Sequence, residues 1–301
     1  MTKNGNLLKR VKESTPLYLM MAPFGILFTV FTVFSVVTAI AIGFTDYNLV
    51  ETPSFVGFSN YVRMLLDDDL ILIATKNTLV FAIITGPISY FLCLLFAWMI
   101  NEFPKPIRMF LTFIFYAPSI SSSIYVVWTY IFSSDSYGLA NSILMNLGFV
   151  SDPVQWLTDT RYILGIVIIV QLWSSLGTSF LAFIAGLQSV DKALYEAGAV
   201  DGIKNRFEEL RYITLPSMGP QLMFAAVMQI GAAFSVSGIC VALAGNPSTD
   251  YAAYTIVTHI AEYASTRYEM GYACALSTVL FLAMYLTNEL IGWFLRRKTN
   301  L

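Results

Sequence analysis

Long apolar stretches alternate with short polar segments along this chain, and they predict helices that cross a membrane. A helix needs about 20 consecutive, mostly apolar residues to cross the hydrocarbon core of a bilayer. Six stretches reach that length, near residues 18–43, 75–100, 107–132, 162–187, 216–243 and 271–295. The first is longer than the apolar core of a secretory signal peptide, so we interpret it as a permanent helix. We therefore expect an all-α integral membrane protein with six transmembrane helices.

The composition agrees with a membrane protein. Of the 301 residues, 57% are hydrophobic and only 12% are charged, which is about half the charged fraction of a soluble domain. Cys93, Cys240 and Cys274 lie in or beside apolar stretches without metal-ligand spacing, which predicts small buried side chains. The only histidine, His259, is expected to satisfy a local hydrogen bond. We expect no catalytic set, no metal site and no nucleic-acid partner.

Basic residues indicate which loops face the cytoplasm, because cytoplasmic loops of membrane proteins carry an excess of lysine and arginine. Thirteen of the 17 basic residues lie in the amino-terminal segment, after the second stretch, between the fourth and fifth stretches, and in the tail. Acidic residues gather in the other loops. We predict that both termini are cytoplasmic, with a segment at 1–17, a six-helix domain at 18–295 and a tail at 296–301.

The apolar stretches limit the transport mechanism. Their middles contain no ionisable side chain, whereas proteins keep such groups in the bilayer chiefly for ion or proton pathways. This argues against a proton-coupled carrier, and it leaves a sodium-coupled or passive carrier possible. The chain also lacks the phosphate-binding loop G-x-x-x-x-G-K-[S/T]. If it drives uphill transport, a partner has to supply the energy.

The longest predicted cytoplasmic loop, at about 188–216, has the pattern of two short helices. From Asp191, apolar residues recur at helical spacing, and Gly202 is expected to end the first helix. A second helix from about Lys204 leads to Pro216, which opens the fifth stretch. Periodicity alone leaves two interpretations open, namely a surface that engages another protein and an amphipathic loop that lies on the membrane.

The residues of this loop add a resemblance to a known family. The loop contains Glu196-Ala197-Gly198-x-x-Asp201-Gly202 and then Ile213-Thr214-Leu215-Pro216, which resembles the EAA loop of binding-protein-dependent ABC importer permeases, nearest to the MalF-like carbohydrate group. Other parts that resemble this group are Asn77-Thr78, Tyr116-Ala117-Pro118 and the stretch from Gly271 to Ser277. Gly198 stands where the family usually has alanine, and the spacing from Gly202 to Ile213 is one residue longer than usual.

The resemblance implies a type I ABC importer permease fold that works by alternating access. It assigns coupling to an ATPase to seven residues, Glu196, Ala197, Gly198, Asp201, Gly202, Leu215 and Pro216. The small residues Ala197 and Gly198 would allow a partner to approach the backbone closely.

The resemblance also implies the partners and the location of the chain. The expected partners are a second homologous permease, a cytoplasmic ABC ATPase dimer that holds ATP and Mg, and an extracytoplasmic sugar-binding protein. The chain itself would bind no cofactor and would lie in a bacterial or archaeal cytoplasmic membrane. An ABC permease for another small solute and an ATP-independent carrier stay as alternatives.

Polar and aromatic residues within the stretches are candidates for a sugar path, because sugars are bound by hydrogen bonds and by apolar contact with rings. The candidates are Gln171, Trp173, Ser174, Ser175, Gln229 and Tyr130, with Ser122 and Ser123 also noted in the third stretch. The alternative is hydrogen bonding between helices, with the serines allowing close packing.

Overall fold

The computed structural model describes residues 14–121 and 125–299, with side chains up to residue 294. Ser122 and Ser123, and most of the predicted amino-terminal segment, lie outside the described residues. The described part consists of helices, turns and loops, apart from an isolated bridge between Thr45 and Phe55. The chain divides into two compact units. Unit 1 takes the residues up to 65 and residues 263–278, and unit 2 takes residues 66–262 and those from 279 onward.

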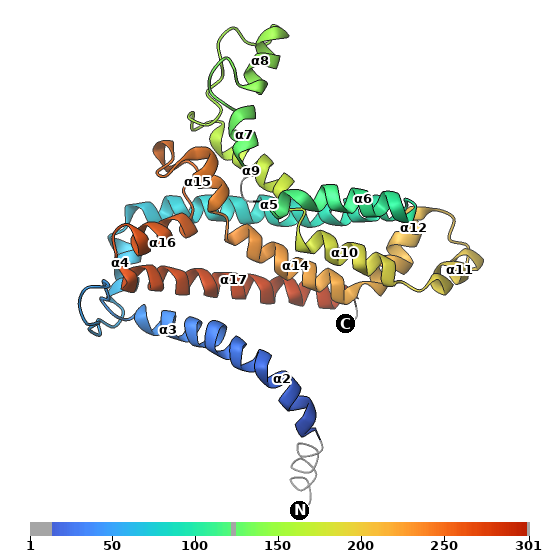
Figure 1. Cartoon of the computed structure of the whole chain (residues 1–301), viewed down its shortest axis with the longest axis horizontal. Coiled ribbons are helices and arrows are strands. Elements are labelled where there is room, and N and C mark those ends of the chain that lie inside the picture. Colours follow the sequence, from blue (N-terminus) through green and yellow to red (C-terminus); the bar gives the residue numbers. More distant parts are fainter. Residues whose placement is uncertain (1–13, 122–124, 300–301) are drawn as a thin grey trace, which may run out of the picture. The chain divides into compact units, whose positions relative to one another are not determined.

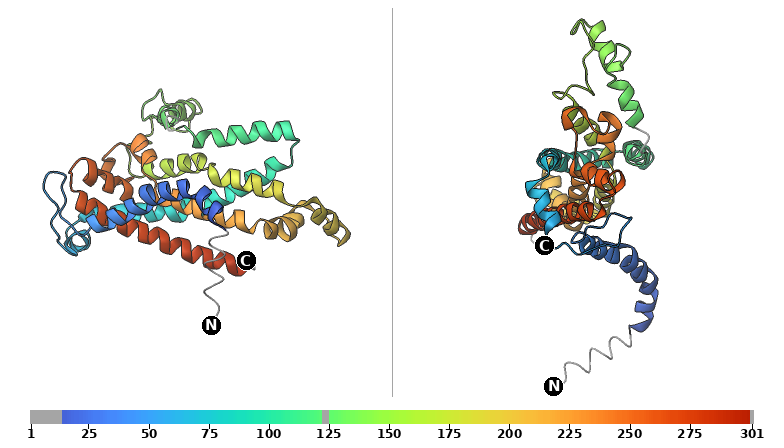
Figure 2. Two further views of the ribbon diagram at one scale, coloured as in Figure 1. Left: turned by 60° about the horizontal axis from the view of Figure 1, so that its bottom comes forward. Right: turned by 90° about the vertical axis from the view of Figure 1, so that its left-hand side faces the viewer.

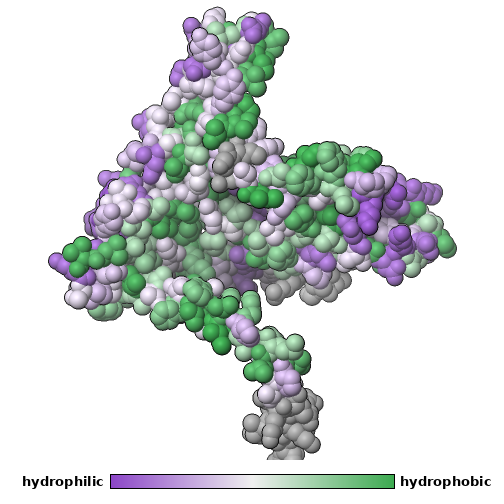
Figure 3. Space-filling model, viewed as in Figure 1, coloured by the Kyte–Doolittle hydropathy of each residue, from purple (hydrophilic) through white to green (hydrophobic). Residues whose placement is uncertain are grey.

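Unit 1 begins with a long apolar helix and continues into a loop. Its elements are α2 (Thr15–Phe28), η1 (Thr29–Val33), α3 (Phe34–Ile42), most of α4 (Ser59–Leu66) and the first turns of α17 (Met270–Thr299). From α2 to α3 the helix is continuous over 28 residues (Figure 1), and hydrophobic side chains predominate on the face seen in Figure 3. No residue of α2, η1 or α3 is buried, so this helix offers most of its apolar surface to lipid or to other protein.

The first turn of α17 packs closely on the loop that follows α3. A Cβ atom on Gly271 would collide with the carbonyl oxygen of Thr45, and the N–H of Gly271 donates to the carbonyl oxygen of Tyr47 (2.8 Å). Arg63 of α4 pairs with Glu269 just before α17. Glycine at position 271 is therefore needed for this close approach.

Unit 2 contains most of the helices. They are α5 (Asp69–Asn101), α6 (Lys105–Tyr116), η2 (Ala117–Ser119), α7 (Tyr125–Ile131), α8 (Leu139–Asn146), α9 (Ile163–Ser174), α10 (Thr178–Ser189), α11 (Lys192–Val200), α12 (Arg206–Glu209), η4 (Leu210–Thr214), α13 (Leu215–Ser217), α14 (Gly219–Phe234), α15 (Gly238–Ala244), η5 (Thr249–Tyr251), most of α16 (Ile256–Ser265) and the rest of α17. Hydrophilic residues gather over α11 and α12 in Figure 3.

The core of unit 2 lies between α5, α10 and α14, which run side by side in Figures 1 and 2. Phe180 and Phe183 of α10 are fully buried there, together with Ala225 of α14 and Cys93 of α5. Small residues on α5 and α14 let the aromatic side chains of α10 fill the space between the helices. Cys93 and Cys240 are buried, which confirms the prediction made for these two thiols.

The number of membrane crossings agrees only in part with the sequence. Four helical spans are long and apolar enough to cross a bilayer, namely α2–α3, α5, α9–α10 and α17, and the pair α14–α15, bent by 41°, would make a fifth. The third predicted stretch is divided among α6, η2 and α7. The described residues thus establish an all-helical protein with four or five candidate spans, and the sixth crossing stays a prediction.

Candidate functional site

Helix α11 is delimited by side-chain and backbone caps at its two ends. The carboxylate of Asp191 accepts a hydrogen bond from the N–H of Ala193 (3.0 Å), which caps the amino terminus. At the other end Gly202 has a φ of +95°, and the N–H of Ile203 donates to the carbonyl oxygen of Gly198 (3.0 Å). This is the Schellman arrangement, which favours glycine in the left-handed position. Gly202 therefore ends the helix, as the sequence predicts.

One face of α11 turns apolar and acidic side chains outward. Val200 is 88% exposed and Leu194 is 46% exposed, and Glu196, Ala197 and Asp201 are exposed as well. Val200 was not among the predicted coupling residues, although the helical spacing of the apolar residues in this loop was the signal for it. Small and apolar side chains at an exposed helix end form a surface that another protein can cover.

The opposite face of α11 packs on η4. Gly198 is buried, and a Cβ atom there would lie 2.6 Å from Cδ1 of Ile213 and 3.0 Å from Cδ1 of Ile203. The hydroxyl of Tyr195 lies 2.9 Å from that of Thr214. The small size of Gly198 therefore serves packing within this chain. Of the two small residues, Ala197 is the one that can allow close approach from outside.

The segment after α11 forms the second short helix two residues later than predicted. Asn205 caps α12 by accepting from the N–H of Glu208 (2.9 Å), and the Glu208 carboxylate reaches back to accept from the N–H of Lys204 (2.9 Å), the residue before the cap. Beyond η4, Leu215 packs against the core of unit 2 while Pro216 is exposed. These two residues join the loop to α14 and do not share the outward face of α11.

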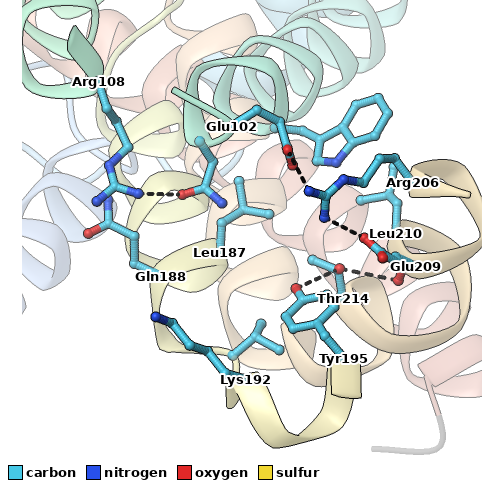
Figure 4. A pocket seen from close by; sticks show the side chains of 13 residues that line it. Glu102, Arg108, Leu187, Gln188, Lys192, Tyr195, Arg206, Glu209, Leu210 and Thr214 are labelled. Atoms are coloured by element: carbon cyan, nitrogen blue, oxygen red, sulfur yellow. Dashed lines mark hydrogen bonds and ion pairs between the residues drawn. The ribbon is translucent and has the colours of Figure 1, made fainter. Parts of the chain in front are cut away.

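An arginine connects this loop to the end of α5. One nitrogen of Arg206 lies 3.3 Å from the carboxylate of Glu102, the residue that follows the last turn of α5. Another lies 2.8 Å from the carboxylate of Glu209. The hydrogen bond that Arg206 donates to Glu209 and the negative charge of Glu102 both raise the pKa of Arg206. These contacts join α12 to α5 (Figure 4).

A hollow of about 510 Å³ lies between the helix ends and this loop. Its walls come from the end of α5, the start of α6, the end of α10 and the segment from α11 to η4 (Figure 4). Arg108 on α6 donates to the side-chain oxygen of Asn101 (3.2 Å). The two loops that the sequence assigns to the cytoplasm thus lie together at one end of unit 2.

Of the candidates for a sugar path, Gln229 is used between helices. It is 5% exposed, and its side-chain nitrogen lies 3.3 Å from Sγ of Cys93 and 3.4 Å from the carbonyl oxygen of Ser175. Gln229 on α14 therefore bridges α5 and the break between α9 and α10. This geometry corresponds to the alternative that the sequence left open, an interhelical hydrogen bond.

The candidates on the fourth stretch lie at a break in the helix. The hydroxyls of Ser174 and Ser175 donate back to carbonyl oxygens of α9, at Val170 and Leu172 (both 2.6 Å), and α10 starts only at Thr178. Gln171 is half-buried on α9. Interrupted helices of this kind line binding sites in many transporters, because they free backbone groups at mid-membrane depth.

The two aromatic candidates lie in different surroundings. The ring of Trp173 meets that of Trp128 edge to face, with centroids 5.2 Å apart. Tyr130 on α7 is 63% exposed, and no hydrogen bond or ring contact joins it to Gln171 or Gln229 within the described residues. The structure therefore brings Ser175 and Gln229 together, and it does not gather the six candidates into one site.

The other end of unit 2 holds a cluster of buried polar residues. The Asn77 amide donates to the carbonyl oxygens of Tyr251 and Tyr254 (both 2.9 Å). Thr78, beside it, accepts from the first N–H of α16 (3.0 Å). His259 is buried, and its Nδ1 lies 3.1 Å from the hydroxyl of Tyr254, which confirms the prediction of a local hydrogen bond. Its Nε2 also lies 2.8 Å from the carboxylate of Asp68. The Asn-Thr pair fastens α16 to the start of α5.

Known proteins resemble this chain over most of its length. No family model matches it. The arabinooligosaccharides transport system permease protein AraP of Bacillus subtilis is 29% identical over 279 residues, 92% of this chain and 87% of that protein. The probable ABC transporter permease protein y4oQ of Sinorhizobium fredii is 31% identical over 226 residues, 74% of this chain and 71% of that protein.

A solved structure has the same fold. It is the crystal structure of a bacterial alginate ABC transporter in complex with an alginate pentasaccharide-bound periplasmic protein. One chain of that complex matches with a TM-score of 0.78 and 26% identity, over 97% of this chain and 98% of its own length.

Proposed function

The chain belongs to the family of ABC transporter permeases, and we propose that it forms, with a second homologous permease, the path of an ATP-driven importer for a sugar or oligosaccharide. It is a multi-pass membrane protein and a transporter subunit, not an enzyme. The carbohydrate class rests on the arabino-oligosaccharide relative and on the alginate transporter.

The observation that supports the coupling role is the two-sided construction of α11. Its outward face presents Glu196, Ala197 and Val200, while its inward face is packed on η4 through Gly198. A cytoplasmic ATPase dimer, with ATP and Mg bound to it, would hold the outward face. Movement of α11 would then pass through η4 and α13 into α14, and through Arg206 to Glu102 on α5. Closure of the ATPases would thereby change the access of the path.

The proposed orientation places the hollow of Figure 4 in the cytoplasm and the Asn77 cluster outside. The distribution of lysine and arginine assigns two loops to the cytoplasm, and both lie at the same end of unit 2. This supports the proposed orientation in the bacterial or archaeal cytoplasmic membrane. An extracytoplasmic binding protein would deliver the sugar at the opposite end. Both chain termini would be cytoplasmic.

The test is to tag the chain, extract it gently from its own membrane and identify the subunits that accompany it. We expect a second permease and an ATPase whose hydrolysis is stimulated by a binding protein with sugar. Glu196→Lys should leave the chain in the membrane and abolish uptake, because Glu196 is exposed on the proposed docking face. Uptake that persists after ATP depletion while the ion gradient is held would instead support a secondary carrier.

A further inference from the structure

A groove beside α6 has the shape and the lining of a binding site for a membrane lipid. It has a volume of about 360 Å³ and runs between α6 and the end of α10. One end is bordered by Lys105 and Arg108, and the lining continues through Met109, Phe113 and Ile184. The groove therefore has a positively charged end and an apolar wall that runs along α6.

The two basic side chains at this end of the groove are available to bind an anion. Within the described residues neither Lys105 nor Arg108 forms an ion pair, and the hydrogen-bond partner of the half-buried Arg108 guanidinium is the neutral side chain of Asn101. By contrast, the nearby Arg206 is shared by two carboxylates. A half-buried guanidinium without a counter-ion favours an anionic ligand at this end of the groove.

The length of the groove fits one leaflet of a bilayer. Helix α6 has 12 residues, which span about 18 Å at 1.5 Å per residue, and half of the hydrocarbon core is about 15 Å. The groove residues recur along α6 at helical spacing from Lys105 to Tyr116. Met109 and Phe113 are 63% and 67% exposed, so an acyl chain could lie against them while its headgroup stays at the basic end.

From these observations we infer that the α6–α10 groove binds a phospholipid of the cytoplasmic leaflet with an anionic headgroup on Lys105 and Arg108. Basic pockets between membrane helices on the cytoplasmic side are suited to such headgroups. The inference rests on the orientation in the proposed function, which puts this end of α6 at the cytoplasmic surface. A helix of the second permease in the groove is the competing occupant.

The experiment uses the full chain with its accompanying subunits, incubated with phosphatidylglycerol or with phosphatidylcholine of the same acyl chains and examined by native mass spectrometry. We expect the chain to retain phosphatidylglycerol in preference to phosphatidylcholine. The double variant Lys105→Gln/Arg108→Gln should lower that retention by about 25-fold, since each basic residue near an anionic headgroup contributes about fivefold. Lys204→Gln/Arg211→Gln is the matched control, because it removes the same charge from exposed cytoplasmic positions outside the groove.

A second variant separates the lipid from a free anion. Thr112→Phe fills the groove and leaves both basic residues in place, so we expect it to lower retention as well. Equal retention of the two lipids, equal losses in both double variants, or displacement by millimolar inorganic phosphate with Thr112→Phe unaffected would each overturn the inference. Because this measurement needs neither sugar nor ATP, its failure leaves the transport proposal to be judged by the uptake experiment.

Discussion

The two ends of unit 2 use polar residues in opposite ways. At the end with Asn77 and His259, the polar side chains are buried and bonded to backbone or to one another, and they hold α16 against α5. At the end with α11, the caps are satisfied within the loop, but charged and apolar side chains such as Glu196 and Val200 point outward. The first end completes its contacts within the chain, whereas the second leaves a surface for a partner.

This difference predicts two kinds of variant. Substitutions at the buried end should lower the stability of the chain and reduce uptake only in proportion to the amount of folded protein. Substitutions at the exposed end should leave stability nearly unchanged and reduce the uptake of each molecule. Measuring uptake per folded molecule separates the two effects.

The largest effect is expected from Gly202→Asp at the end of α11. Gly202 has a φ of +95°, which non-glycine residues adopt at a cost of about 1–2 kcal/mol, and the new carboxylate would lie beside the outward face of the helix. We expect the protein to reach the membrane and its uptake to be abolished. Radiolabelled sugar uptake, normalised to the amount of protein in the membrane, measures this.

The control is Gly57→Asp in unit 1. Gly57 is also left-handed, with a φ of +58°, but it lies in the loop before α4, away from α11 in sequence and in a different unit. It adds the same carboxylate at another glycine with a positive φ. If both variants lose uptake equally, the loss is a general folding defect and the coupling assignment of Gly202 fails.

The next effect is expected from Asn77→Ala at the buried end. This change removes two donated hydrogen bonds. The carbonyl oxygen of Tyr251 still accepts from the N–H of Tyr254, whereas that of Tyr254 loses the Asn77 donor. An unsatisfied buried polar group costs about 1–3 kcal/mol. We expect a lower thermal midpoint and unchanged uptake per folded molecule. Asn48→Ala is the matched control, because Asn48 accepts only local hydrogen bonds in an exposed turn.

The sequence predicts the long continuous helices well and the interrupted ones poorly. The run placed at 75–100 lies within α5 (Asp69–Asn101), and the run at 18–43 nearly coincides with α2 to α3. Counting apolar residues does not reveal the break at Ser175–Gly177, because apolar residues predominate on both sides of it. Such breaks depend on which helices pack beside them. At this break, the side chain of Gln229 on α14 donates to the carbonyl oxygen of Ser175.

Helix α11 shows, at single residues, that local features can be predicted from the sequence and tertiary contacts cannot. Asp191 and Gly202 mark its ends in the sequence because capping is local and needs only nearby backbone. The nearest neighbour of Gly198 is Ile213, on η4 beyond α12, and only the folded loop reveals this contact. The sequence therefore predicts where α11 begins and ends, and tertiary packing decides which face is free.

A smaller effect is expected from cutting the contact between the loop and α5. Arg206 and Glu102 are 66% and 43% exposed at their side chains, so their pair contributes at most about 1 kcal/mol to stability. If it transmits movement, Arg206→Ala and Glu102→Ala should each lower uptake two- to threefold without changing the thermal midpoint. The double variant should be no worse than the single ones. Arg161→Ala, which removes a local exposed pair with Asp159, should leave uptake unchanged, and additive losses at Arg206 and Glu102 would contradict a shared role.

The smallest effect is expected at Gly198, where packing inside the chain and docking outside it make different predictions. In Gly198→Ala the new Cβ atom would press on Cδ1 of Ile213, while alanine favours the helix by about 1 kcal/mol over glycine. Because the clashing atom is the tip of a side chain, we expect a loss of uptake below about twofold. Ile213→Val removes that atom, so the double variant should recover uptake relative to Gly198→Ala alone. If Gly198 instead touched the ATPase, Ile213→Val would give no recovery, and the inward assignment of this face of α11 would have to be abandoned.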